Sequence, residues 1–406
     1  MRPHRPLLAG LGVAALLIAG SVVSTPARVG AAVECNVKIG SKDEPAGPPW
    51  EQKRLNVRQV WPISDGSGVL VAVIDSGFNT EGTQLSKIHL RPGVNVSGVF
   101  GPTDTRDCVY HGTAVTGIIA APMTEGKYFA GIAPGVQIMP IKEQQADQQQ
   151  DTNHIAEAIL EAVKAHVNVI NISITTPVPT PDLEQAVAAA AAADIVIVAA
   201  GGNDGSSSNL PAYPAAYSTT YPNVLAVSMT DQDDGVSGIS TRGSYIDIAA
   251  PGKGVELPMP KNTYLGNQEG TSFAAPIVTG TVALVRSAHR KLTAAQVVSR
   301  IEATADAPPG LTVPSAEYGY GIVNPYLAVT AVRNDAASPP PVARPAAIPA
   351  VPPPPPTDRH LQHLALGVGV ALLGLAVLAG LVSAIIRRGS WFGGVHTPAP
   401  PPPARD

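Results

Sequence analysis

The stretch Val-Leu-Val-Ala-Val-Ile-Asp-Ser-Gly, residues 69–77, decides the fold class of this chain. A continuous apolar run without polar alternation is typical of a strand in a parallel sheet that is covered by helices on both faces. The run ends at Asp75, which is followed by Ser76 and Gly77. Because α/β sheets place their sites at the carboxyl ends of their strands, Asp75 is the first candidate functional residue.

Short apolar runs and helical stretches alternate along the residues that follow this strand. Strands are predicted at 69–74, 136–141, 167–172, 195–199 and 224–227. Helices are predicted at 113–121, 152–166, 181–193, 272–290 and 294–304. Strands that alternate with helices predict βαβ units, a parallel sheet with right-handed crossovers, and hence one large α/β domain.

The composition of the whole chain excludes several classes of protein. The 406 residues are 45% apolar, so full disorder is excluded, and the formal net charge of -4 argues against nucleic acid as the main partner. Charged residues make up 14% of the chain, below the ~25% of ordinary soluble domains. The apolar and proline-rich residues that depart furthest from ordinary composition lie at the two ends.

The first 32 residues have the order of a secretory signal peptide. A basic start at Arg2 and Arg5 precedes an uncharged, mostly apolar stretch over 7–23, and small residues then offer cleavage after Ala27 or Ala32. The alternatives are an amphipathic first helix or an uncleaved anchor.

A second apolar segment lies near the C-terminus. Residues 364–386 carry no charge, and as a helix they would be about 35 Å long, enough to cross a membrane. Arg387 and Arg388 follow at once, and positive flanks favour the cytoplasmic side. We therefore expect a single-pass protein of the cell membrane, with membrane lipid around this helix and the large domain on the extracytoplasmic side.

The chain is divided by these segments into six parts. A stretch ending in five consecutive prolines should form an extended stalk between the domain and the membrane. The predicted parts are a signal peptide (1–32), an N-terminal extension (33–67), the α/β domain (68–333), a proline-rich stalk (334–363), a transmembrane helix (364–386) and a cytoplasmic tail (387–406).

The chain contains two cysteines, Cys35 and Cys108. In an exported protein a small, even number of cysteines predicts one disulfide. Such a bond would tie the N-terminal extension to the middle of the domain. A pair of free thiols is the alternative.

Two further segments supply residues that complement Asp75 chemically. His111 and Gly112 stand just before a predicted helix, and Ser272 opens another, where backbone N–H groups point the same way as its hydroxyl. Taken singly, each is common in turns and helix caps. Together they provide a nucleophile, a base that activates it and a carboxylate that orients the base.

Acyl transfer also requires a donor to the oxyanion that develops on the carbonyl. The segment Ile-Val-Ile-Val-Ala-Ala-Gly-Gly-Asn-Asp places Asn203 after a predicted strand and two glycines. We therefore expect its side-chain amide to reach the developing oxyanion and donate a hydrogen bond to it.

The order Asp75, His111, Asn203, Ser272 resembles that of the subtilisin-like serine proteases. The most specific segments are Gly-Thr-Ser-x-Ala-x-Pro at 270–276 and His-Gly-Thr at 111–113, and the similar region covers about 68–329. The resemblance implies a mainly parallel, doubly wound sheet between helices, and a catalytic domain at 68–333.

The resemblance also implies residues that bind the substrate. Ile172, Ser173 and Ile174 resemble the strand on which the family pairs an extended peptide, and Thr175 is expected at the rim of the primary specificity pocket. Many subtilisins have glycine where this chain has Thr175. On the opposite wall of the specificity pocket the resemblance places Ala200, Gly201 and Gly202.

A signal, an extracytoplasmic protease domain, a proline stalk and one C-terminal span together resemble the mycosins, the membrane-anchored proteases of type VII secretion systems. Gly-Pro-Pro-Trp at 47–50 and Asp-Cys-x-x-His-Gly-Thr at 107–113 agree, and so does 292–309. Mycosins are similar in having a disulfide near the catalytic histidine, which matches Cys108. This chain lacks the second cysteine pair that they commonly carry.

The mycosin resemblance implies a serine endopeptidase that acts on proteins or peptides and associates with the type VII secretion membrane complex. It also implies that the extension at 33–67 wraps the catalytic domain, so the protease should be competent without removal of a prodomain. The alternative is mainly a structural cap or scaffold of that complex, with proteolysis secondary.

Two other enzyme classes are weighed against this interpretation. Asp-Ser-Gly at 75–77 also matches aspartic proteases, but those need two such carboxylates and no second motif exists. A metalloenzyme is disfavoured because no His-Glu-x-x-His pair or Cys/His cluster is present. The acidic turn with Asp231, Asp233 and Asp234 is interpreted as solvated, so neither a metal nor a cofactor is expected.

Overall fold

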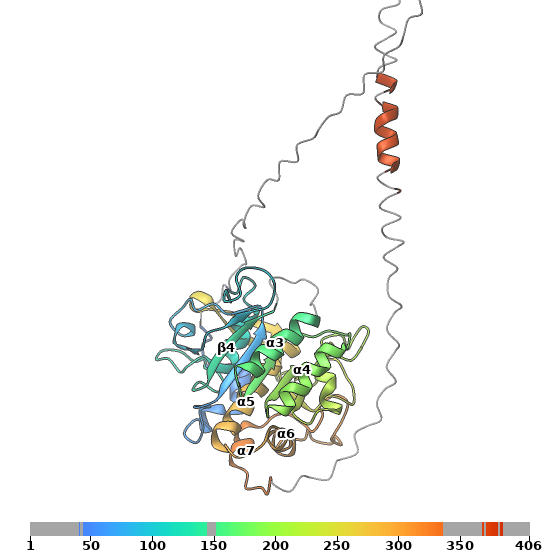
Figure 1. The fold of residues 1–406 in the computed structure, drawn as a ribbon. Helices are drawn as coiled ribbons and strands as arrows, with labels where there is room; N and C mark the ends of the chain where they lie inside the picture. Colours follow the sequence, from blue (N-terminus) through green and yellow to red (C-terminus); the bar gives the residue numbers. More distant parts are fainter. Residues whose placement is uncertain are drawn as a thin grey trace, which may run out of the picture. The chain divides into compact units, whose positions relative to one another are not determined.

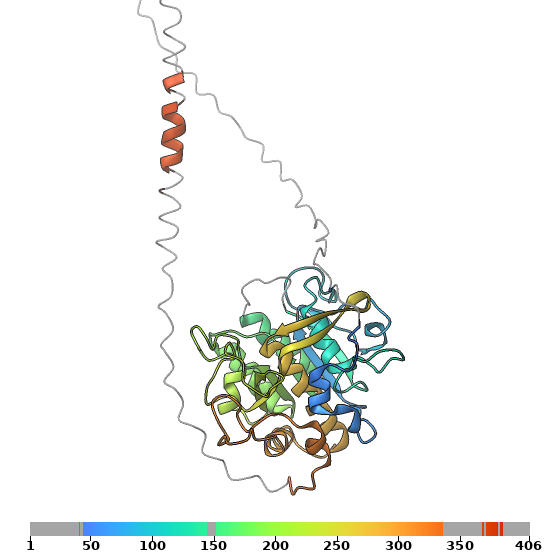
Figure 2. The ribbon, with the colours of Figure 1, turned by 180° about the vertical axis from the view of Figure 1, so that it is seen from behind.

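The computed structural model describes residue 40, residues 44–143 and 152–335, and residues 368, 371–380 and 382–384. The chain divides into two units, Met1–Ala350 and Val351–Asp406. The first unit contains the α/β domain seen from opposite sides in Figures 1 and 2. The predicted signal peptide, almost all of the stalk and the tail lie outside the described residues.

The main sheet of the described domain is parallel, as the sequence predicts. Its strand order is β2-β4-β1-β5-β6-β7-β8, β3 also pairs with β4, and each of these pairings is parallel. The strands are β1 (Leu70–Asp75), β2 (His89–Leu90), β3 (Val94–Asn95), β4 (Gln137–Lys142), β5 (Val169–Ile172), β6 (Val196–Ala200), β7 (Val224–Thr230) and β8 (Ile248–Pro251).

The order of the strands reverses around β1. The chain adds β4 on one side of β1 and then crosses to add β5 on the other side. Reversals of this kind open a crevice at the carboxyl ends of the strands, where α/β proteins bind ligands. Asp75 is the last residue of β1 and lies in register with Lys142, the last residue of β4.

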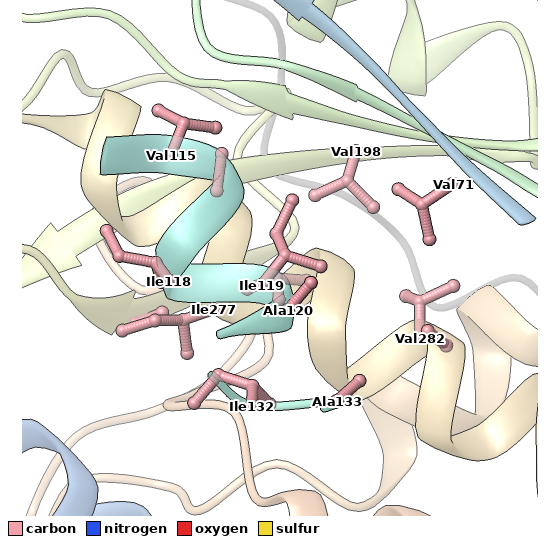
Figure 3. Packing of buried hydrophobic residues seen from close by; sticks show 14 of the residues in the cluster. Val71, Val115, Ile118, Ile119, Ala120, Ile132, Ala133, Val198, Ile277 and Val282 are labelled. Carbon is pink, nitrogen blue, oxygen red and sulfur yellow. The ribbon is translucent and has the colours of Figure 1, made fainter. Parts of the chain in front are cut away.

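Helices cover both faces of this sheet (Figures 1 and 2). Ala72 and Ile74 of β1 face a cluster that contains side chains of α3 and α4, whereas Val71 and Val73 face α2 and α5. Figure 3 shows the second cluster, in which valines of β1 and β6 meet α2 and α5. The helices are α1 (Trp50–Leu55), α2 (His111–Ala120), α3 (Thr152–Lys164), α4 (Pro181–Ala192), α5 (Thr271–Ala288), α6 (Ala294–Ala303) and α7 (Pro325–Thr330).

Continuous apolar strands arise from this two-sided burial. Every residue of β5, β6 and β7 is buried, so no position favours a polar side chain through exposure to water. The predicted doubly wound sheet between helices is therefore confirmed, and the predicted helices and strands are present with ends shifted by a few residues.

One predicted boundary differs in a way that affects the site. His111 and Gly112 belong to the first turn of α2 instead of preceding the helix. The helix begins earlier because its cap is Tyr110 in the left-handed conformation (φ 63°), with no capping bond from its own side chain. Side chains outside the cap position accept the N–H groups of this turn, namely Asp107 just before it and Ser76 from the distant loop after β1.

The antiparallel hairpin of β9 (Lys253–Met259) and β10 (Thr263–Glu269) is absent from the sequence predictions. It carries Gly254 and Pro258 and changes register within the pair, so its sequence lacks a regular period. The hairpin leads directly into α5 and contributes one wall of the cleft described below.

Residues 44–67 of the predicted extension pack on the domain. The indole N–H of Trp50 donates to the carbonyl of Gly254 (2.9 Å), and Gln52 Nε2 donates to the carbonyl of Ala130 (2.7 Å). Three of its apolar side chains belong to the main core, namely Leu55, Val57 and Val60. This packing agrees with an extension that wraps the catalytic domain.

The second unit is described only in part. Residues 371–380 and 382–384, inside the predicted span at 364–386, are helical. Among the residues that the structure describes, no helix has both the length and the apolar character needed to cross a membrane. The transmembrane helix stays a prediction, because the rest of the segment lies outside the described residues.

Cys108 lies in the loop before α2, where it is buried and disulfide-bonded. Cys35 lies outside the described residues. The Cys35–Cys108 pairing therefore stays a prediction.

Candidate active site

Asp75 lies fully buried at the carboxyl end of β1. Its Oδ1 accepts a hydrogen bond from the backbone N–H of Ser76 (2.7 Å). A buried carboxylate needs compensating partners, since an isolated charge in a protein interior is costly. The partner that matters for chemistry comes from α2.

His111 is the first residue of α2 and lies beside Asp75. Its Nδ1 is 2.8 Å from Asp75 Oδ1, and with an acceptor carboxylate opposite, Nδ1 carries the proton. The basic lone pair is then on Nε2. The imidazole ring lies 5.4 Å from the ring of Phe273, which limits its freedom to turn.

Ser272 is the second residue of α5 and is only 9% exposed. Its position at a helix N-terminus places its own backbone N–H beside its hydroxyl, and the helix dipole favours negative charge there. Pro276, one turn later, has no N–H to donate to the Ser272 carbonyl.

Asn203 follows β6 and is connected to the same helix start. Its side-chain oxygen accepts hydrogen bonds from Thr271, whose neighbour is Ser272. With the oxygen used in this way, the Asn203 amide group has its two N–H donors available for a ligand.

A cavity of about 500 Å³ brings these residues together. His111, Asn203 and Ser272 line it, and Asp75 lies behind His111. Its other lining residues are Val109, Tyr110, Ala114, Ser173, Ile174, Thr175, Ala200, Leu257, Met259, Leu265, Gln268, Thr271 and Phe273. A serine, a histidine oriented by a carboxylate and an amide donor around one cleft can carry out acyl transfer.

The predicted substrate-binding residues divide into two groups. Ser173, Ile174, Thr175 and Ala200 line the cleft. Gly201 and Gly202 do not line it among the described residues; both are buried, and the Gly202 N–H donates to Thr271 Oγ1 (3.2 Å). Gly202 is thus connected to the start of α5 through Thr271.

Other lining residues were not identified from the sequence. Leu257, Met259 and Leu265 come from the hairpin, which has no recognisable motif. Thr271 stands inside the Gly-Thr-Ser segment and could have been identified there, but its role depends on the distant Asn203.

Lys142 is a buried cation close to the site. Its Nζ donates to the carbonyls of Ser76 (2.9 Å) and Arg106 (2.5 Å). Burial lowers the pKa of Lys142, while the charges of Asp107 and Asp104 act in the opposite direction. The lysine therefore serves as a countercharge beneath the loops that carry the site residues.

No group of three or more His, Cys, Asp or Glu side chains that could hold a metal occurs within the described ranges. The acidic turn has structural partners instead. Asp231 Oδ1 accepts the N–H groups of Asp233 and Gly235, and Asp234 forms an ion pair with Arg54 (2.8 Å). Asp234 therefore anchors the N-terminal extension through Arg54. The sequence-based interpretation of this turn as solvated did not predict that contact.

Comparison with known proteins agrees with this geometry. The subtilase family model, peptidase family S8, matches residues 66–321. Thermitase of Thermoactinomyces vulgaris is 34% identical over 280 residues, which are 68% of this chain and 94% of thermitase. Mycosin-4 of Mycobacterium tuberculosis (strain ATCC 25618 / H37Rv) is 35% identical over 380 residues, covering 81% of this chain and 80% of mycosin-4.

Solved structures extend the likeness to the fold. MycP1 from the ESX-1 type VII secretion system has a TM-score of 0.64 and 27% identity, covering 73% of this chain and 91% of that one. MycP1 from Mycobacterium smegmatis has a TM-score of 0.62 and 27% identity, covering 74% and 90%. The chain therefore belongs to the subtilase family and is a serine endopeptidase that resembles the mycosins.

Proposed function

We propose that this chain is a membrane-anchored, mycosin-like endopeptidase that acts outside the cytoplasmic membrane and is associated with type VII protein secretion. The observation that carries the chemical part is the hydrogen bond between His111 Nδ1 and Asp75 Oδ1, in a cleft that Ser272 also lines. The secretion part is supported by the similarity to mycosin-4 and to MycP1.

In the proposed reaction, Ser272 Oγ attacks the carbonyl carbon of a peptide bond while His111 Nε2 takes the hydroxyl proton. Asp75 holds the imidazole tautomer and stabilises the imidazolium that forms. The backbone N–H of Ser272 and the amide of Asn203 donate to the oxyanion. His111 then returns the proton to the leaving amine, and a water molecule hydrolyses the acyl-enzyme by the same steps.

The proposed substrates are proteins or peptides bound in extended form. Ser173 and Ile174 offer an edge along the cleft on which a peptide strand can pair. Thr175 also lines the cleft, and its side chain makes the cleft narrower than a glycine at this position would. The small and apolar lining gives no reason for a strongly charged residue at the cleavage point.

Membrane anchoring is proposed for residues 364–386. The support is the uncharged run of 23 residues followed by Arg387 and Arg388. Within it, Leu372, Leu373 and Leu375 belong to a helix and are exposed in the described unit. Deletion of 364–406 should convert an alkali-resistant membrane protein into a released one, and retention in the membrane fraction would contradict the anchor.

A fluorophosphonate probe tests the chemistry. The wild-type chain should be labelled on Ser272, and Ser272→Ala should abolish labelling. Ser206→Ala, which changes an exposed serine, is the matched control and should keep it. Labelling that persists in Ser272→Ala would exclude Ser272 as the nucleophile.

The same variant separates catalysis from a scaffold role in secretion. If Ser272→Ala still assembles into the membrane complex but secretion changes, proteolysis has a function there. If secretion and assembly both remain unchanged, the structural role is sufficient and the proteolytic part of the secretion proposal fails.

A further inference from the structure

Asp107 is a second buried carboxylate near the site, only 2% exposed. It accepts five hydrogen bonds. Its Oδ1 accepts from the N–H groups of Val109 (3.0 Å) and Tyr110 (2.8 Å) and from Ser76 Oγ (2.9 Å). Its Oδ2 accepts from the N–H and the hydroxyl of Thr113 (2.8 and 2.7 Å). The donors come from the loop of Asp107 itself, from the start of α2 and from Ser76 after β1.

These bonds supply the missing cap of α2. Tyr110 is the cap residue, yet no side chain of its own closes the helix start. Asp107 accepts two N–H groups of that turn, and the Gly112 N–H donates to Ser76 Oγ (2.9 Å). Because His111 is the first residue of the helix, Asp107 and Ser76 determine where its backbone lies.

Ser76 Oγ also lies between two carboxylates. It is 3.2 Å from Asp75 Oδ1 and 2.9 Å from Asp107 Oδ1. A hydroxyl has one proton to donate, and the shorter distance assigns it to Asp107. Asp75 is then held by the Ser76 backbone N–H and by His111.

Lys142 supplies the countercharge for this arrangement. Its ammonium group donates to the carbonyls of Ser76 and Arg106, the residue before Asp107. A buried carboxylate without a nearby cation would be strongly destabilising. Lys142 and Asp107 therefore connect the loop after β1, which carries Ser76, with the loop before α2.

We propose that Asp107 is a positioning residue for the peptidase reaction, because its carboxylate fixes the turn that carries His111 against the turn that carries Asp75. Asp107 does not line the cleft, so it acts through Ser76 and the start of α2. The inference rests on the triad proposed above. Its physical basis is that a misplacement of about 1 Å in a catalytic group can cost on the order of 10² in rate.

The test is Asp107→Asn in the full-length chain, measured by the rate of labelling with a fluorophosphonate over a range of pH. Asparagine has nearly the same shape but one acceptor oxygen, so its NH₂ group must face donors. We expect the maximal labelling rate to fall about 10- to 100-fold while the half-saturating probe concentration changes less than twofold.

The pH profile provides a readout that a merely structural role would not change. The charged groups around this network are Asp75 from β1, Lys142 from β4, Asp107 itself, and Asp104 and Arg106 from the same loop. Loss of the Asp107 charge disfavours the protonated imidazole of His111, so the acid limb of the profile should move to lower pH. A decrease in rate with an unmoved acid limb would contradict the proposal.

Asp104→Asn is the matched control. Asp104 lies in the same loop, but its carboxylate pairs with Arg106 at the surface (2.7 Å) and forms no hydrogen bond with α2 in the part of the chain that the structure describes. This variant also removes one negative charge but leaves the hydrogen bonds at the start of α2 in place, so its labelling rate and acid limb should stay much closer to those of the wild type than those of Asp107→Asn do. If Asp107→Asn behaves like Asp104→Asn, the positioning role is excluded.

Ser76→Ala decides the outcome if Asp107→Asn does not fold by circular dichroism. It removes the hydroxyl that connects the two carboxylates and leaves the Asp107 bonds to Tyr110 and Thr113 in place. A tenfold loss of labelling rate supports the proposal, and an unchanged rate overturns it. A wild-type chain that is not labelled would instead contradict the proposed triad, so the two failures are distinguishable.

Discussion

The side-chain oxygen of Asn203 accepts two hydrogen bonds from Thr271, one from the backbone N–H (2.9 Å) and one from the hydroxyl (3.0 Å). Thr271 is the first residue of α5 and immediately precedes Ser272. The amide donor and the nucleophile are therefore held to the same helix start. This connection prevents the amide from rotating to present its oxygen, which would repel an oxyanion.

Asn203→Ala should lower kcat by roughly 10² to 10³ with little change in KM, because the lost donor acts mainly in the transition state. Thr271→Val keeps the backbone bond and loses the hydroxyl bond, so a loss of about fivefold is expected. Thr271→Ser keeps both bonds and is the control. Turnover of a fluorogenic peptide selected on the wild-type enzyme measures all three, and an equal loss in Thr271→Ser and Thr271→Val would contradict the orienting role.

Gly112 allows the close approach of α2 to β1. A Cβ on this residue would lie 2.3 Å from the carbonyl oxygen of Gly77 and 3.1 Å from Cβ of Asp75. Gly112→Ala should therefore push His111 away from Asp75 and lower the fluorophosphonate labelling rate at least about tenfold, with the 1–3 kcal/mol destabilisation typical of overpacking. Gly101→Ala, where a Cβ meets nothing within 4 Å, should leave both unchanged. Equal labelling in the two variants would show that the approach is not required.

Replacement of Lys142 should lower the free energy of unfolding, because this lysine stabilises the fold and takes no direct part in the reaction. Lys142→Met removes the buried ammonium, leaves the carbonyls of Ser76 and Arg106 without their donor and leaves Asp107 without a countercharge. Breaking a buried pair in this way costs about 3–5 kcal/mol. Urea denaturation measures the loss, and Lys87→Met, at an exposed lysine, is the control. A loss below about 1 kcal/mol would mean that Asp107 does not depend on this cation.

The parts that the sequence predicts well are those whose signal is local. A buried parallel strand ending in Asp75, a small-residue helix at His111 and a serine at a helix start each lie within one short segment. Burial on both faces gives β5, β6 and β7 their mostly apolar sequences, so the order of the α/β elements is also readable.

The parts that the sequence does not predict depend on contacts between distant segments. The role of Thr271 needs Asn203, 68 residues away, and the cap of α2 needs Ser76, 36 residues from Gly112. The hairpin of β9 and β10 has an irregular register and carries no motif, although three of its apolar residues line the cleft. Gly201 and Gly202 resemble wall residues but are absent from the lining of the cleft, and their backbone N–H groups donate to Val227 and Thr271.

The N-terminal extension should remain in the active enzyme. Its residues Leu55, Val57 and Val60 belong to the main core, and it contributes no residue to the described lining of the cleft. A chain that starts at Gly68 should therefore fold poorly, whereas one that starts at Val33 should be active. N-terminal sequencing of probe-labelled protein checks this, and a mature N-terminus beyond Gly68 would contradict it.

The extension should also make stability depend on pH through Glu51. Glu51 of α1 is only 4% exposed. Burial raises its pKa from 4.5 to about 8, and the charge of Glu256 makes a smaller contribution in the same direction. Hydrogen bonds from two backbone N–H groups lower the pKa but do not offset the effect of burial. The folded chain thus holds a proton that the unfolded chain releases above about pH 4.5. The contribution of Glu51 to stability is therefore fully present below pH 4.5 and is lost as pH rises toward 8.

Glu51→Gln keeps the shape of the side chain and cannot ionise, so it should remove this dependence. The free energy of unfolding of the variant, minus that of the wild type, should increase from pH 5 to pH 8 by at most roughly 1.4 kcal/mol per pH unit. Urea denaturation at pH 5, 6, 7 and 8 measures it, with Glu157→Gln, at an exposed position of α3, as the control that should show no such trend. A difference between Glu51→Gln and wild type that stays constant over this range would mean that Glu51 ionises alike in the folded and unfolded chains.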